Sequence, residues 1–232
     1  KFLSQNLYTK KNKLAIIGLG YVGLPLAIEF GKKRDVLGFD INKERIEELK
    51  KSIDSTFEVS NNEFKEAINL KFTYSIDEIK NCKIFIATIP TPVNGKNKPD
   101  LSLLKNCCEM IGSIIKKGDL VIFESTVYPG VTEEICMPII EKKSELKFNK
   151  DFFCGYSPER INPGDKVNTL TKIMKITSGS CSESAAVVDK LYSSIITAGT
   201  FLAKSIRVAE AAKVIENTQR DLNIALVNEL SV

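Results

Sequence analysis

Short apolar runs alternate along the chain with longer segments in which apolar residues recur every three or four positions. The apolar runs predict buried β-strands, and the periodic segments predict amphipathic helices. The predicted strands are 13–17, 36–39, 72–74, 84–88, 120–123, 152–156, 173–177 and 200–202. The predicted helices are 21–33, 43–51, 101–116, 131–143, 183–194 and 205–232. This alternation favours an α/β fold: a Rossmann-like, doubly wound, mainly parallel sheet with helices on both faces, followed by a long connecting helix.

A glycine-rich element joins the first predicted strand to the first predicted helix. Gly18, Gly20 and Gly23 form a G-x-G-x-x-G pattern that also contains Tyr21 and Val22. The first glycine permits a tight turn, the second lets a pyrophosphate approach the backbone, and the third lets helix and strand pack closely. Free N–H groups at the helix N-terminus favour the anion. The element therefore predicts a dinucleotide site.

Asp40 ends the second predicted strand, about 20 residues after the glycines, where an acidic residue binds the adenosine ribose hydroxyls. A carboxylate there would repel a 2′-phosphate, so the sequence favours NAD over NADP. Arg45 follows one turn into the next helix. Its spacing fits either a contact with the adenosine end of the cofactor or an ordinary solvated helix arginine.

Two loops follow strands that should end beside the glycine loop. Residues 88–92 contain two prolines, and residues 124–130 read Glu-Ser-Thr-Val-Tyr-Pro-Gly. In open parallel sheets, ligands bind beyond the carboxyl ends of the strands. We therefore expect both loops at the cofactor cleft, although stiff connecting turns would have the same composition.

Polar residues gather again after the strand predicted at 152–156. Segment 157–165 confines Glu159 and Arg160 among prolines and a glycine, so the glutamate could exchange a proton and the arginine could hold an anion. Lys213 and Asn217 lie one turn apart on the last predicted helix and share a face. Spacing alone leaves a solvated loop and a solvent-facing pair as alternatives.

Composition narrows the classes of partner. The chain has 232 residues, a net charge of +4, no histidine and six cysteines without a CxxC pair. Lysines and acidic residues are interleaved, which argues against a nucleic-acid surface. No apolar run approaches the ~20 residues of a membrane span, and residues 1–12 lack a secretory signal. The composition predicts a soluble cytoplasmic protein with reduced cysteines, no metal site and no membrane partner.

The last predicted helix has no stop signal before Val232, and the chain begins at Lys1. We interpret the sequence as a fragment. It divides into an N-terminal extension (1–12), an NAD-binding Rossmann-like domain (13–204) and the start of a long connecting and dimerisation helix (205–232). We expect a second domain to follow this helix.

Together these motifs resemble those of the nucleotide-sugar 6-dehydrogenases, the UDP-glucose and GDP-mannose dehydrogenase superfamily. The resemblance rests on the glycine loop, Pro-Thr-Pro at 90–92, Ser-Thr-Val at 125–127, Ser-Pro-Glu-Arg at 157–160, and Lys213 with Asn217. Segment 156–166 is most similar to the branch that acts on UDP-N-acetylglucosamine and UDP-N-acetylgalactosamine in surface-polysaccharide synthesis.

The resemblance implies a two-step, NAD-dependent oxidation of the sugar C6 alcohol to a carboxylate, and a homodimer formed through the long helix. It assigns catalytic roles to Thr126, Glu159, Lys213 and Asn217. Glu159, Arg160, Ile161, Asn162 and Lys213 would bind the substrate. The residues that would bind NAD are Gly18, Gly20, Tyr21, Val22, Gly23, Asp40, Arg45, Thr88, Pro90, Thr91, Ser125 and Thr126.

Other functions stay open at this point. The nucleophilic cysteine that the family uses would lie beyond Val232, together with the UDP-binding domain. A UDP-glucose 6-dehydrogenase, another nucleotide-sugar dehydrogenase and a non-catalytic NAD-binding fragment are the alternatives. A β-hydroxyacid or 6-phosphogluconate-type dehydrogenase would lack the element at 157–165.

Overall fold

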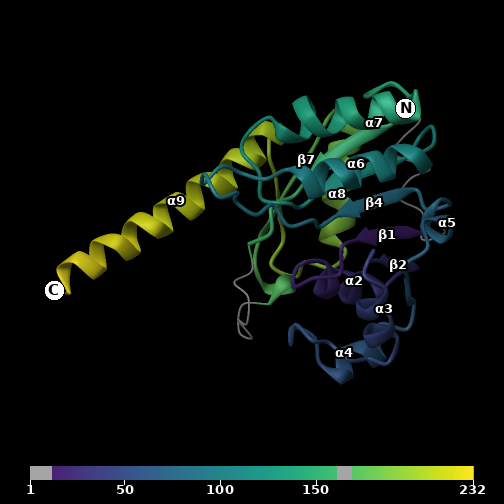
Figure 1. Cartoon of the computed structure of the whole chain (residues 1–232), viewed down its shortest axis with the longest axis horizontal. Helices are drawn as coiled ribbons and strands as arrows, with labels where there is room; N and C mark the ends of the chain where they lie inside the picture. The colour runs from purple at the N-terminus through teal and green to yellow at the C-terminus, as the bar shows by residue number, and fades with distance from the viewer. Residues whose placement is uncertain (1–11, 161–168, 232) are drawn as a thin grey trace.

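The computed structural model describes residues 12–160 and 169–231, and an eight-stranded sheet forms its centre (Figure 1). The strands are β1 (Leu14–Ile17), β2 (Val36–Phe39), β3 (Leu70–Thr73), β4 (Ile84–Ala87), β5 (Leu120–Phe123), β6 (Phe153–Tyr156), β7 (Lys175–Gly179) and β8 (Thr200–Leu202). Their order is β3-β2-β1-β4-β5-β6-β7-β8. Neighbouring strands are parallel except β6 and β7, which are antiparallel. The strand order reverses between β1 and β4, so a ligand crevice is expected beyond their carboxyl ends.

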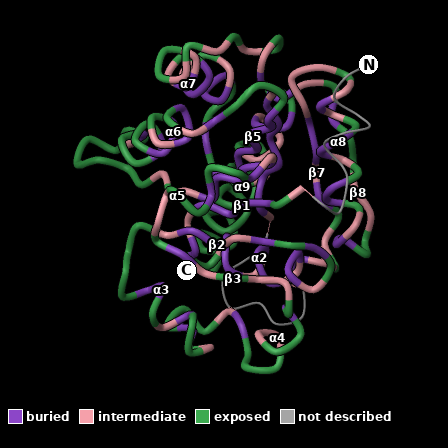
Figure 2. Tube along the Cα trace, turned by 90° about the vertical axis from the view of Figure 1, so that its right-hand side faces the viewer, coloured by how far each residue is buried: buried purple, intermediate pink, exposed green. Residues whose placement is uncertain are grey.

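Helices cover both faces of the sheet. They are α2 (Gly23–Gly31), α3 (Lys43–Lys50), α4 (Asn61–Glu66), α5 (Ile76–Ile79), α6 (Ser102–Ile114), α7 (Met137–Ser144), α8 (Ser182–Ser193) and α9 (Ile206–Leu230). Leu14 and Ile16 pack in one buried cluster with α2 and α8, whereas Ala15 and Ile17 pack in a second with α6 and α7. Because alternate strand residues point to opposite faces, a fully apolar strand such as β1 contributes side chains to the buried clusters on both faces of the sheet. Figure 2 shows β1 and β5 buried at the centre.

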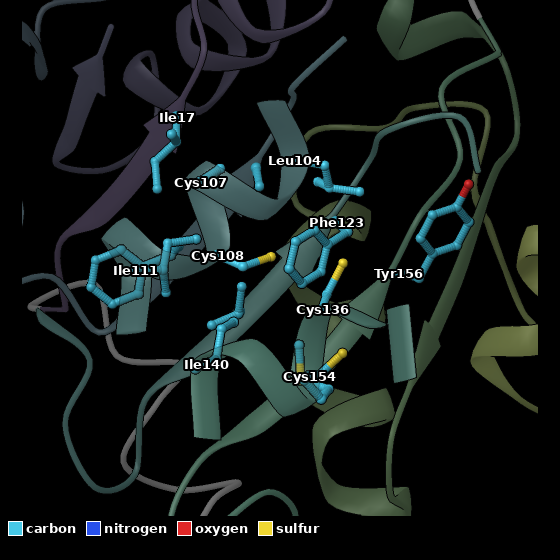
Figure 3. Close-up of a cluster of buried hydrophobic side chains, with 14 of the residues drawn as sticks. Ile17, Leu104, Cys107, Cys108, Ile111, Phe123, Cys136, Ile140, Cys154 and Tyr156 are labelled. Atoms are coloured by element: carbon cyan, nitrogen blue, oxygen red, sulfur yellow. The ribbon is translucent and has the colours of Figure 1, made fainter. Parts of the chain in front are cut away.

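The cluster on the α6 and α7 side contains most of the cysteines. Figure 3 shows the sulfur atoms of Cys108, Cys136 and Cys154 among apolar side chains that include Phe123 and Ile140. All six cysteines are free, and five of them are buried; Cys181 is half-buried. Burial raises the pKa of the Cys82 thiol to about 11 and that of Cys107 to about 12, which keeps them protonated and unreactive. The described part of the chain contains no cluster of ligands suited to a metal ion.

The structure confirms the predicted fold class and adds elements that the pattern did not predict. Helices α4 and α5, and a 3-10 turn at Leu170–Lys172, are too short to show a period of 3.6 residues. The helix predicted from residue 131 opens with a π-helical turn, Thr132–Cys136. Pro138 is the second residue after this turn and has no N–H to continue the regular hydrogen-bond pattern.

The C-terminal part of helix α9 extends away from the body of the domain (Figure 1). Ile206, Ala209 and Glu210 are its buried residues. Other apolar side chains along it are exposed: Val208, Ile215, Leu222, Ile224, Leu226, Val227 and Leu230. Across the described residues, no helix has the length and apolar character that crossing a bilayer requires.

Candidate functional site

A cavity of about 890 Å³ lies beyond the carboxyl ends of the central strands. Its walls come from the glycine loop after β1, from the ends of β2, β4 and β5, and from helices α6 and α9. The predicted site residues that line it are Gly18, Gly20, Tyr21, Val22, Asp40, Thr88, Pro90, Thr91, Ser125, Thr126, Glu159 and Lys213. Twelve positions distant in sequence are thus brought to one site.

The glycine loop is held by the start of the loop that follows β4. Gly18 adopts a φ of 91°, which suits glycine, and its carbonyl accepts a hydrogen bond from Thr88 Oγ1 at 2.6 Å. A Cβ atom on Gly23 would lie 1.8 Å from the Gly18 carbonyl oxygen. A Cβ atom on Gly20 would meet nothing within 4 Å, and Gly20 lines the cavity. Gly23 therefore permits packing within the protein, and Gly20 leaves backbone open toward the cavity.

Asp40 lies at the end of β2 and lines the cavity. Its Oδ2 accepts from Leu19 N at 2.8 Å, and its Oδ1 accepts from Asn42 N at 2.9 Å. These bonds fix the carboxylate between the glycine loop and the start of α3. The position agrees with the predicted contact to an adenosine ribose.

Arg45 lies behind the glycine loop and does not line this cavity. Its Nε donates to Leu19 O at 3.1 Å, and its NH2 forms an ion pair with Asp54 at 2.7 Å. The side chain is buried, with 9% of its surface exposed. Arg45 is therefore not a solvated arginine: it anchors the loop from within the protein, and its contact with the adenosine end of the cofactor stays a prediction.

The loops after β4 and β5 brace each other at the cavity. Thr91 Oγ1 donates to Thr126 O at 2.5 Å, and Tyr156 OH donates to Ser125 O at 3.0 Å. From α9, the Glu210 carboxylate accepts from Gly130 N at 2.6 Å and Thr132 N at 3.0 Å. Helix α9 and the β5 loop are therefore fixed relative to each other, which places Lys213 over the cavity.

Three charged side chains form a buried group at the cavity wall. Lys175 Nζ lies 2.8 Å from Glu124 Oε2 and 2.8 Å from Glu159 Oε2. Tyr192 OH donates a hydrogen bond to Glu124 Oε1. Burial raises the pKa of Glu124 to about 7, and the charge of Glu159 adds to this rise against the opposing effect of Lys175. Burial opposes the charge on Lys175, but the two carboxylates outweigh it and raise its pKa.

The remaining predicted site residues lie on or near α9. Burial lowers the pKa of Lys213, which lines the cavity. Arg160 Nε pairs with Glu216 at 3.1 Å, and Asn217 is exposed one turn beyond Lys213. Neither Arg160 nor Asn217 lines this cavity, and the predicted contacts of Ile161 and Asn162 lie outside the described residues.

The sequence reasoning missed Glu124 and Lys175. The sequence predicts the loop at 124–130 at the cofactor cleft and assigns no role to Glu124. Lys175 lies in the strand predicted at 173–177, and a lysine within an apolar strand needs a buried partner. A lysine in an otherwise apolar strand was therefore the available signal. The sequence could not identify its partners Glu124 and Glu159, which lie 51 and 16 residues away.

The residues that line the cavity fit NAD. Ser125 Oγ is buried and has no hydrogen-bond partner among the described residues, so a ligand in the cavity can supply one. The open backbone at Gly20 and the start of α2 suit a pyrophosphate, and Asp40 suits a ribose. Apolar walls from residues such as Ile17, Ile89 and Leu103 complete a cavity of the kind that binds cofactors.

The comparisons with known proteins agree with this geometry. Residues 12–196 match the family model of the UDP-glucose/GDP-mannose dehydrogenase family, NAD binding domain. The UDP-N-acetyl-D-glucosamine 6-dehydrogenase of Pseudomonas aeruginosa is 62% identical over 223 residues, which cover 96% of this chain and 53% of that protein. Protein CapL of Staphylococcus aureus is 53% identical over 94% of this chain and 51% of its own length. The chain spans about half the length of these curated relatives.

Solved structures show the same architecture. A UDP-N-acetyl-D-mannosamine dehydrogenase from Pyrococcus horikoshii superposes with a TM-score of 0.86 at 35% identity, covering 94% of this chain and 52% of that one. A GDP-mannose dehydrogenase from Pseudomonas aeruginosa, 21% identical, shares the fold with a TM-score of 0.85, over 93% of this chain and 51% of that one. Fold, glycine loop and family model agree, and the chain belongs to the UDP-glucose/GDP-mannose dehydrogenase family, of which it carries the NAD-binding domain.

Proposed function

We propose that this chain is the cofactor-binding half of an enzyme that oxidises the C6 alcohol of a UDP-N-acetylhexosamine to a uronic acid. The observation that carries the proposal is the cavity, which Glu159 and Lys213 line together with the glycine loop. The 62% identity to a UDP-N-acetyl-D-glucosamine 6-dehydrogenase supports the class of sugar. The resemblance of segment 156–166 to the branch of surface-polysaccharide synthesis supports a role in making polysaccharide precursors.

Residues at the cavity take different roles in the oxidation of the C6 alcohol. The glycine loop and Asp40 would hold NAD, which would supply the hydride acceptor for the C6 carbon. Lys213, which is half-buried and lines the cavity, stabilises the negative charge that develops on the C6 oxygen. Glu159 accepts the proton of the hydroxyl group, and Thr126 helps to hold the water used in the second step. Asn217 orients the substrate, and Arg160, Ile161 and Asn162 bind it.

Turnover of nucleotide sugars tests this function. A protein that joins this chain to the length found in its relatives should release two NADH per molecule of UDP-N-acetylglucosamine or UDP-N-acetylgalactosamine. UDP-glucose, UDP-N-acetylmannosamine and GDP-mannose serve as comparison substrates. This chain alone should bind NAD without turning over any of them. Faster oxidation of UDP-glucose or GDP-mannose would contradict the proposed class of sugar.

Asp40 should determine the choice between NAD and NADP. Asp40→Ala is expected to narrow the preference for NAD by about tenfold, or ~1.4 kcal/mol, because the repulsion of a 2′-phosphate is removed. Calorimetric titration of both cofactors measures the change. Asp40→Asn is the matched control, since it keeps an acceptor for Leu19 N but removes the charge. Equal affinities for the two cofactors in the parent chain would contradict the assignment.

We also propose that α9 forms a homodimer interface. Leu222, Leu226 and Leu230 follow one another at four-residue spacing and are 64%, 59% and 77% exposed, which is unusual for a surface without a partner. Light scattering should show self-association that Leu222→Glu with Leu226→Glu abolishes. Ile68→Glu, at an exposed site on another part of the domain, should leave association unchanged. A parent chain that is monomeric at high concentration would argue against the interface.

The protein is proposed to work in a reducing compartment, the cytoplasm. Six free cysteines, five of them buried, are typical of proteins that are not stabilised by disulfides.

A further inference from the structure

The reversed strand β7 brings a lysine to the edge of the sheet where the cavity lies. Because β6 and β7 are antiparallel, the first residue of β7 lies at the edge where β6 ends. Gly155 pairs with Gly179, and Tyr156 pairs with Ser178. Extension of this register places Glu159 opposite Lys175. A parallel β7 would have put Lys175 at the opposite edge, far from the cavity.

Lys175 is the shared partner of two carboxylates that both line the cavity. Its side chain is 2% exposed, and those of Glu124 and Glu159 are 0% and 9% exposed. Both ion pairs measure 2.8 Å. Two ionised carboxylates that share one ammonium group in a buried site repel each other across a short distance, which is unfavourable. A proton on one carboxylate relieves this repulsion.

The surroundings indicate which carboxylate holds the proton. Glu124 is fully buried at the end of β5, and this burial opposes its charged form more strongly than the hydrogen bond donated by Tyr192 of α8 favours it. Tyr156 of β6 also lies near Glu124. Glu159 accepts from Arg160 N at 2.6 Å and lies within the field of Lys213 of α9. Glu159 therefore has the more favourable surroundings for a negative charge, and burial raises the pKa of Glu124 to about 7.

We propose that Lys175 and Glu124 are positioning residues for Glu159: Lys175 holds the Glu159 carboxylate at the cavity wall, and Glu124 carries the one proton that the two buried carboxylates share. Glu159 is thereby kept ionised and able to accept a proton from a group in the cavity. This rests on the proposed function, in which that proton leaves the C6 hydroxyl group as the hydride passes to the cofactor.

The titration of the two carboxylates tests the arrangement without any sugar. The whole chain is labelled with 13C at the glutamate side-chain carboxyl groups, and Glu124→Gln and Glu159→Gln assign the two NMR signals. The Glu124 signal should titrate near pH 7. In Glu159→Gln its midpoint should fall by about one pH unit, because a neighbouring negative charge is lost. In Lys175→Met it should rise, because the neutralising cation is lost.

Two further variants keep the test decisive. Lys175→Arg keeps the charge and should return the Glu124 midpoint toward that of the parent, which loss of packing alone would not explain. Glu47→Gln, at an exposed position of α3, should move neither midpoint. A Glu124 midpoint that is unchanged in Glu159→Gln, or two parent carboxylates that both titrate near pH 4, would overturn the inference.

A kinetic measurement addresses the role in catalysis. In a protein that joins this chain to the remaining length of its relatives, Lys175→Met should move the acidic limb of the kcat/KM profile to higher pH, because Glu159 loses the cation beside it. Glu124→Gln should leave that limb in place, because Glu124 is already neutral where Glu159 titrates. An unchanged limb in Lys175→Met would overturn the positioning role. If the coupled titration is observed but no nucleotide sugar is oxidised, the proposed function fails and the buried arrangement stands, so the two failures are distinguishable.

Discussion

Gly23→Ala should disrupt the glycine loop, destabilise the chain by about 3 kcal/mol and abolish NAD binding. The new Cβ atom would lie 1.8 Å from the Gly18 carbonyl oxygen and 2.3 Å from Thr88 Oγ1. Neither atom can move away without a large cost in free energy. The Gly18 oxygen belongs to the backbone, and Thr88 Oγ1 is on a short side chain that donates a hydrogen bond to Gly18 O. Denaturant unfolding measures the loss of stability, and calorimetry measures the loss of NAD affinity.

Gly20→Ala is the matched control within the same loop. Its Cβ atom would meet nothing within 4 Å, so the free energy of unfolding should change by less than about 0.5 kcal/mol. NAD affinity should nevertheless fall, because the methyl group occupies the cavity side of the loop. If Gly23→Ala folds and binds NAD as the parent does, the close packing described for this loop is wrong.

Arg45→Met should cost about 3 kcal/mol of stability, because it leaves the Asp54 carboxylate buried without its cation. The Asp54 side chain is 1% exposed and lies 2.7 Å from the Arg45 guanidinium. The substitution also removes the hydrogen bond to Leu19 O, so NAD affinity should decline together with stability. Lys50→Met breaks an exposed ion pair with Glu47 on the same helix and should cost at most about 1 kcal/mol.

The pH dependence gives a second readout for this ion pair. Burial alone would raise the pKa of Asp54, but hydrogen bonds from Thr56, Arg45 and the backbone outweigh it and lower the pKa below the usual 3.8. The stability that this carboxylate contributes is therefore present above pH 3.8 and is lost as the pH falls through the lower folded-state value. Arg45→Met should therefore already be less stable than the parent chain at neutral pH, where the Asp54 carboxylate is ionised. Equal stability of Arg45→Met and Lys50→Met would contradict the anchoring role.

The sequence predicted the layers of the fold well because apolar runs and helical periods report burial directly. Every predicted strand has a counterpart in the sheet, and the glycine loop joins strand to helix as expected. The direction of a strand cannot be predicted in this way, since the apolar pattern of β7 is the same whichever way the strand runs. Nothing in residues 173–177 indicated that β7 would run against β6 and so carry Lys175 to the cavity.

The site was predicted where a motif ties residue type to backbone geometry, and missed where long-range contacts decide. Gly18, Gly20 and Asp40 lie where their spacing implied. Arg45 turned away from the cavity because Asp54, in the loop that follows α3, offers a buried carboxylate that helical spacing does not reveal. The role of Glu124 could not be predicted, because it depends on the ion pair with Lys175, and Lys175 lies beside Glu124 only after the sheet has formed.

The account depends most on the cavity being the NAD site. A titration of the 15N-labelled chain with NAD, followed by amide NMR, tests this directly. The amide signals of Gly18, Gly20 and Ser125 should shift together and reach saturation, while those of exposed residues on α4 stay in place. Saturable shifts confined to residues outside the cavity, or no shifts at millimolar NAD, would contradict it.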